Sequence, residues 1–181
     1  MCTAETRSKS PLITPVKIIA VYLVWKVFHY WVSIHGTFEN QLWTNLIFDT
    51  GHVYALATGF CLKGLGVDVS VTGITISLVK SGRDLWVQEH CLAIPAVVVF
   101  TGTVIVLNGT PKDKAWFMPL GIAGIVFINI IRLVFVALAW NYLSPYYFKM
   151  HHTIIYACVT YGFIFLIIRW WILRQALENK I

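Results

Sequence analysis

Apolar residues gather along the chain into long runs separated by short polar stretches. The runs cover residues 16–33, 42–62, 92–107, 117–142 and 153–173. Most of them approach the roughly 20 residues that a helix needs to cross the hydrocarbon core of a bilayer. Tryptophan and tyrosine cluster at the ends of runs, as in WNYLSPYY and RWW, which fits the aromatic belts at membrane surfaces. The pattern predicts about five transmembrane helices.

The stretch at residues 67–90 has a different period. Apolar and polar residues alternate in VDVSVT before Gly73 and again in ITISL after it. KSGRD then reads as a turn, and LWVQ as a third short extended piece. Alternation with a period of two, broken by glycine and a charged turn, predicts a β-hairpin or small meander. Because open sheets do not occur in the hydrocarbon region, we expect this piece to lie outside it, on the extracytoplasmic side.

The orientation of the N-terminal part stays open. With five spans and the β segment outside, the C-terminus lies inside and the N-terminus outside. However, Arg7, Lys9 and Lys17 would favour the inner side by the positive-inside rule. Asp49 and His52 also interrupt the second run, so this run need not be a simple span.

The composition supports a membrane protein. The chain of 181 residues is 58% hydrophobic and 12% charged, whereas soluble domains carry about 25% charged residues. The net charge is +6, but the basic residues are scattered and sit mostly at the ends of runs, which suits lipid headgroups better than nucleic acid. The four cysteines form no CxxC pair and no zinc spacing, which argues against a redox pair or a zinc module.

Arg132 is the most unusual residue of the fourth run. It sits in GIVFINIIRLVFVALAW, with long apolar stretches on both sides. A central arginine costs about 2.5–3.5 kcal/mol on insertion scales, so an ionisable residue there is a candidate functional site. Asn129 lies on the same helix face. The alternative is a structural polar tie between two helices.

Cys91 and a pair of histidines lie where apolar runs begin. Cys91 follows the β segment and precedes a helix whose early Pro95 suits a first turn. Helix N-termini favour thiolates, although Glu89 opposes this effect. His151 and His152 open the fifth run, where the helix dipole would favour a neutral imidazole that can act as a base. Each feature alone also fits an unreactive residue at a span boundary.

The predicted topology brings these residues together. The third span begins on the outer side, the fourth carries Arg132 in its outer half, and the fifth begins outside at the histidines. Cys91, Arg132 and His151 or His152 can therefore converge at one membrane face. A histidine could take the thiol proton and later protonate a leaving amine. The arginine could stabilise an oxyanion or orient a substrate carbonyl.

The chain resembles the exosortase/archaeosortase family in three features: the β stretch leading to Cys91, the N-x-x-R of FINIIRL and the histidine opening the next run. By this resemblance it would be a compact bacterial member. The resemblance covers about residues 66–171. It implies a polytopic cysteine transpeptidase that cleaves C-terminal sorting signals, each a short motif, a transmembrane helix and a basic tail. The nucleophile would be Cys91, with Arg132 and either His151 or His152, of which His152 is nearer the apolar run. Where many members have small residues after the cysteine, this chain has Leu-Ala-Ile.

The sequence therefore predicts an all-α polytopic membrane protein of one domain, residues 1–181. Residues 67–90 form its extracytoplasmic β segment and residues 91–173 its catalytic helices. Its catalytic residues would be Cys91, Arg132, His152 and His151, with Asn129 as a supporting residue. We expect no metal and no cofactor, a location in the inner (cytoplasmic) membrane, and exported proteins with C-terminal transmembrane sorting signals as partners.

Two other functions remain open. In the first, the protein is a non-catalytic assembly or transport subunit in which Arg132 is a structural tie. In the second, His90, Cys91, His151 and His152 hold copper or zinc, because thiol and imidazole suit both metals.

Overall fold

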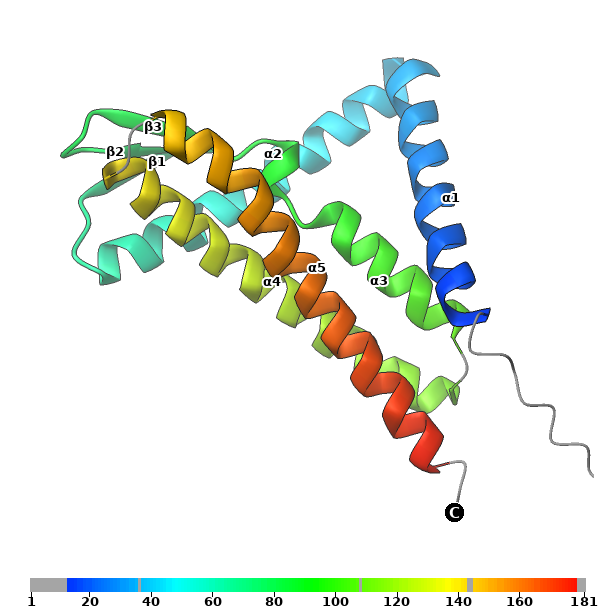
Figure 1. The fold of residues 1–181 in the computed structure, drawn as a ribbon. Helices are drawn as coiled ribbons and strands as arrows, with labels where there is room; N and C mark the ends of the chain where they lie inside the picture. The colour runs from blue at the N-terminus through cyan, green and yellow to red at the C-terminus, as the bar shows by residue number, and fades with distance from the viewer. Residues whose placement is uncertain (1–12, 36, 108, 143–144, 179–181) are drawn as a thin grey trace, which may run out of the picture.

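The computed structural model describes residues 13–35, 37–107, 109–142 and 145–178. This part of the chain is mostly helical and includes one small sheet (Figure 1). Its elements are α1 (Ile13–His35), α2 (Thr37–Gly64), β1 (Val69–Thr72), β2 (Thr75–Leu78), β3 (Arg83–Trp86), the 3-10 turn η1 (Glu89–Cys91), α3 (Ile94–Val106), α4 (Pro111–Tyr142) and α5 (Pro145–Glu178).

The three strands form an antiparallel meander in the order β1-β2-β3. The predicted meander is therefore confirmed. Gly73 and Gly82 make the two turns with positive φ angles of 58° and 64°, which glycine adopts without the strain of a side chain. The second turn is shorter than KSGRD suggested, because Arg83 and Asp84 already belong to β3.

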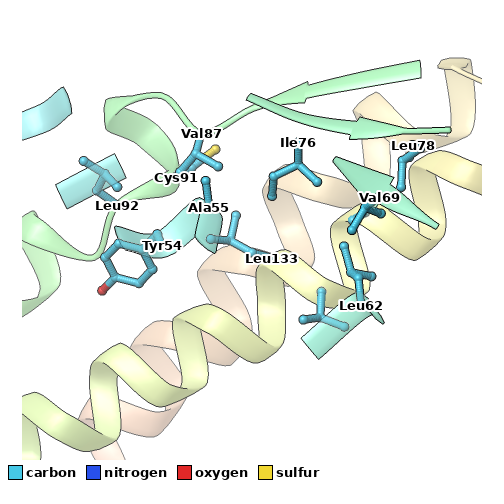
Figure 2. Close-up of a cluster of buried hydrophobic side chains, with 12 residues drawn as sticks. Tyr54, Ala55, Leu62, Val69, Ile76, Leu78, Val87, Cys91, Leu92 and Leu133 are labelled. Atoms are coloured by element: carbon cyan, nitrogen blue, oxygen red, sulfur yellow. The ribbon is translucent and has the colours of Figure 1, made fainter. Parts of the chain in front are cut away.

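One face of the sheet is buried against α2 and α4. Val69, Ile76 and Leu78 point from β1 and β2 into a cluster that also contains Leu62 of α2 and Leu133 of α4 (Figure 2). The alternation of apolar and polar residues seen in the sequence is thus the alternation between this buried face and the exposed one. The cluster fixes the sheet at one end of the helices.

Helices α3, α4 and α5 pack side by side, and α4 and α5 run antiparallel (Figure 1). A second apolar cluster lies between them and includes Phe100, Phe117, Ile125 and Trp171. The rings of Phe117 and Trp171 are stacked with centroids 4.4 Å apart. This cluster continues the core from the sheet towards the opposite end of the helices.

That opposite end gathers several basic side chains. Lys17 at the start of α1 and Lys114 at the start of α4 donate to the carbonyls of Val106 and Ile105, at 3.2 and 2.8 Å. Cations there satisfy carbonyls that the last turn of α3 leaves without helical partners. α5 reaches the same end, because Trp171 lies against Gly109.

Two helices begin earlier than the apolar runs predicted. α4 starts at Pro111 rather than at residue 117, and α5 starts at Pro145 rather than at residue 153. In α4 the Thr110 hydroxyl accepts the Asp113 backbone N–H at 3.2 Å and donates to the Asp113 carboxylate at 2.6 Å. This capping pair starts the helix in a polar turn, which a search for apolar residues misses.

The second apolar run forms α2, which packs along the sheet. Gly51 of α2 lies against Ile74, and Gly59 lies against Val71, so α2 follows the sheet over several turns. Since an open sheet stays outside the hydrocarbon, this packing keeps much of α2 at the sheet end of the molecule. The number of membrane-crossing helices, about five by sequence, stays a prediction.

The outer faces of α4 and α5 are apolar. Phe127 and Phe135 of α4 are 63% and 67% exposed, and Phe165 and Leu166 of α5 are each 62% exposed. Such faces suit contact with lipid better than contact with water. Among the described residues, one helix, Pro111–Asn141, is long and apolar enough by itself to cross a membrane, and Ile94–Val106 is a shorter apolar helix.

Candidate functional site

Cys91 ends the 3-10 turn that leads from the sheet to α3. Its backbone N–H donates to the Gln88 carbonyl at 2.7 Å, and the Leu92 N–H donates to the Glu89 carbonyl at 3.0 Å. α3 then begins at Ile94, with a proline in its first turn. The predicted order of β segment, cysteine and helix is confirmed, but Cys91 lies in a separate turn ahead of the helix rather than in its first turn.

The cysteine side chain is buried beneath the sheet. Cys91 is 9% exposed and belongs to the same cluster as Val87 and Leu133 (Figure 2). Its Sγ lies 4.0 Å from the Trp86 carbonyl oxygen, which is within reach of a weak S–H hydrogen bond. Leu92 follows it into this cluster. The site is thus formed at the joint between sheet and helices, in a place of low water content.

Asn129 and Arg132 of α4 both donate to the backbone carbonyl of Cys91. The Asn129 Nδ2 lies 2.9 Å from this oxygen and the Arg132 Nη1 lies 3.3 Å from it. The same Nη1 donates to the Asn129 Oδ1 at 2.9 Å. Asn129 is fully buried and Arg132 is 5% exposed. The three residues form one polar network inside an apolar core.

This network shows how α4 holds the cysteine turn. Hydrogen bonds to a charged group are stronger than those between neutral groups, and burial removes competition from water. Two donors on one carbonyl fix the direction of the peptide that follows Cys91. The sequence spacing correctly placed Asn129 and Arg132 on one helix face, but it could not show that their shared acceptor is the main chain of Cys91.

The side chains of His151 and His152 lie outside the part of the chain whose side chains the structure describes. Their backbone belongs to α5, which begins at Pro145, more than one turn before His151. The expectation that they open the helix is therefore wrong. A helix dipole acts mainly on its first and last turns, so it provides no argument for a neutral imidazole at these positions.

Most side chains of the proposed metal site lie outside the part of the chain that the structure describes. The side chains of His90, His151 and His152 are outside the described part, and only Cys91 of this set lies within it. Among the side chains that are described, no group of three or more His, Cys, Asp or Glu residues could hold a metal ion.

Sequence reasoning missed a second polar contact beside Cys91. The His29 Nε2 of α1 lies 2.6 Å from the Glu89 Oε1 of η1. A signal was available, because His29 is a titratable residue within the first apolar run, as Arg132 is within the fourth. Its partner lies 60 residues away, and spacing alone does not reveal such a distant pair.

A comparison with known families gives the family of this chain. The sequence matches the family model for transmembrane exosortase (Exosortase_EpsH) over residues 18–170. The chain belongs to the transmembrane exosortase family. It is therefore a membrane protein of the exosortase family, and the match includes the sheet, the Cys91 turn, the Asn129–Arg132 pair and most of α5. Searches among curated proteins and among solved structures give no match.

Proposed function

We propose that this exosortase-family protein is a membrane-embedded cysteine protease or transpeptidase that cleaves C-terminal sorting signals of exported proteins. The observation that supports this proposal most is that Asn129 and the buried Arg132 both donate hydrogen bonds to the Cys91 carbonyl. A reactive thiol needs a fixed position relative to its substrate. Burying the Arg132 charge costs free energy. The charge would be retained despite this cost because it fixes the position of the Cys91 turn.

In the proposed reaction, the Cys91 sulfur attacks the carbonyl carbon of a peptide bond in the sorting motif. The thiol proton passes to His152 or His151, and the tetrahedral intermediate carries its negative charge on the former carbonyl oxygen. Arg132 stabilises this oxyanion or orients the substrate carbonyl. The intermediate collapses when the C–N bond breaks, and the histidine protonates the leaving amine. Attack on the thioester by an amine completes transfer, and attack by water completes hydrolysis.

The location of the reaction relative to the membrane is also proposed. We propose that the protein crosses the inner (cytoplasmic) membrane several times, with the sheet and Cys91 at the extracytoplasmic face. The substrate would be an exported protein whose C-terminal transmembrane helix lies in the same bilayer. The chemistry uses side chains alone and calls for no cofactor.

The test is to co-express the chain with a candidate protein that ends in a short motif, one apolar span and a basic tail, and to follow its processing by gel shift. Cys91→Ala and Arg132→Ala should both abolish processing. Cys158→Ala, which changes an exposed cysteine of α5, should leave it intact. Normal processing in Cys91→Ala would refute the proposed nucleophile.

A non-catalytic role as a polar tie has one observation in its favour. The hydrogen bonds from Arg132 to Asn129 and to the Cys91 carbonyl would serve structure equally well. Alanine at position 91 keeps the backbone carbonyl and therefore keeps the tie. If this role is the whole function, Cys91→Ala is silent, while Arg132→Leu lowers the yield of folded protein.

A further inference from the structure

The turn that carries Cys91 is held from a second side by α1. Glu89 starts this turn, and its carboxylate accepts a hydrogen bond of 2.6 Å from the His29 ring. Asn129 and Arg132 hold the other end of the turn from α4. The two anchors come from helices far apart in the sequence, and both act on the three residues of η1.

The orientation of His29 is set by two tryptophans. The His29 ring lies 5.8 Å from the Trp25 ring and 5.8 Å from the Trp43 ring, the latter edge-on. Trp25 is itself buried and lies one turn from His29 on α1. The imidazole and the carboxylate remain 36% and 34% exposed. The aromatic rings therefore direct the imidazole at Glu89, while both polar groups keep access to water.

Glu89 lies in the same three-residue turn as Cys91. Its carboxylate, when ionised, repels anionic groups that approach this turn. An imidazole that donates to this carboxylate holds it in place, and in its protonated form it also cancels the charge. The backbone of Glu89 accepts from the Leu92 N–H, so fixing its side chain also restrains the turn.

We propose that His29 and Glu89 are positioning residues that orient the Cys91 turn and screen the Glu89 charge from the thiol. This inference rests on the proposed role of Cys91 as the nucleophile. It adds α1 and the start of α2 to the elements that prepare the site. The substrate carbonyl would then meet a turn that is fixed from both α1 and α4.

The test measures the electrostatic surroundings of the sulfur directly. In protein whose Cys2, Cys61 and Cys158 are replaced by serine, Cys91 is alkylated in detergent micelles with neutral iodoacetamide and with anionic iodoacetate. His29→Gln removes the imidazole that contacts the Glu89 carboxylate. The iodoacetate rate should then fall about three- to tenfold more than the iodoacetamide rate, as expected for one charge at short range and partial exposure.

Three further variants make the result specific. His29→Lys keeps a cation and should restore the ratio of the two rates. The double variant His29→Gln/Glu89→Gln removes the unscreened charge and should restore it as well. Asp68→Asn removes an exposed carboxylate before β1 and should leave the ratio unchanged.

Two outcomes would overturn the inference. One is an unchanged ratio in His29→Gln. The other is an equal fall of both rates in all His29 variants, which would mean that the pair only supports the fold. The substrate test separates this inference from the proposed function. If processing requires Cys91 but the ratio of the iodoacetate and iodoacetamide rates is unchanged in His29→Gln, only the positioning role is refuted. If Cys91→Ala still processes substrate, the proposed function fails whatever the ratio shows.

Discussion

A guanidinium inside an apolar core is tolerated only when its charge is matched by well-placed acceptors. The Arg132 Nη1 meets this condition with the Asn129 Oδ1 and the Cys91 carbonyl. The sequence predicted the Asn129–Arg132 pair because residues three apart share a helix face. It could not predict the main-chain acceptor, which lies 41 residues away from Arg132, or the contact of His29 with Glu89. Local spacing carries no information on such distant pairs.

Replacing Asn129 tests the network as a unit. Asn129→Leu has a similar volume but removes a donor to the Cys91 carbonyl and an acceptor for Arg132. We expect a loss of about 1–3 kcal/mol in unfolding free energy, since a buried charge-linked hydrogen bond is lost. Equilibrium unfolding of the purified protein in mixed detergent and SDS micelles measures it. Asn45→Leu, at an exposed position of α2, should change stability by less than about 0.5 kcal/mol. Equal stability of the two variants would contradict the account.

At the scale of elements, the close crossing of helices depends on small residues. An alanine Cβ at Gly121 of α4 would lie 2.1 Å from the Phe100 ring of α3. Phe100 is fully buried and lies against Phe117, so its ring has little room to move aside. Apolar runs predicted each of these helices, because hydrophobicity dominates their middle parts. Their polar ends, and the path of α2 along the sheet, depend on capping and tertiary contacts that the runs do not encode.

The Gly121 crossing gives a prediction with a matched control. Gly121→Ala should lower the unfolding free energy by about 1–3 kcal/mol, the usual cost of overpacking. Gly162→Ala lies within α5, where the added Cβ meets no atom within 4 Å, and it should be neutral or stabilising by up to about 1 kcal/mol. The same SDS unfolding assay compares them. Equal effects of the two substitutions would show that α3 and α4 do not cross as described.

At the scale of the whole molecule, the two ends differ in kind. The sheet, the Cys91 turn and α2 occupy one end, while the start of α1, the end of α3, the start of α4 and the last turns of α5 meet at the other (Figure 1). The second end carries Lys17, Lys112, Lys114 and Arg174. The positive-inside rule predicts that this end faces the cytoplasm. If α2 stays at the sheet end, α1 can begin and α5 can end on the cytoplasmic side. This orientation would place Lys17, at the start of α1, on the side that the positive-inside rule favours.

This orientation predicts a labelling pattern in intact cells. Single cysteines are placed at Ser70 of β1 or at Lys112 of α4, both exposed positions, in a chain otherwise free of cysteine. A membrane-impermeant maleimide should label Ser70→Cys from outside and Lys112→Cys only after the membrane is opened. The reverse pattern would place the Cys91 site in the cytoplasm and rule out exported substrates.

If Cys91 forms a thioester with the substrate, the acyl-enzyme itself can be detected. The protein is purified after co-expression with a tailed substrate and analysed by intact-mass and peptide mass spectrometry. The account predicts an adduct of the substrate's N-terminal part on Cys91 that hydroxylamine releases, that Cys61→Ala retains and that Cys91→Ala lacks. Processed substrate without such an adduct, or an adduct that persists in Cys91→Ala, would contradict it.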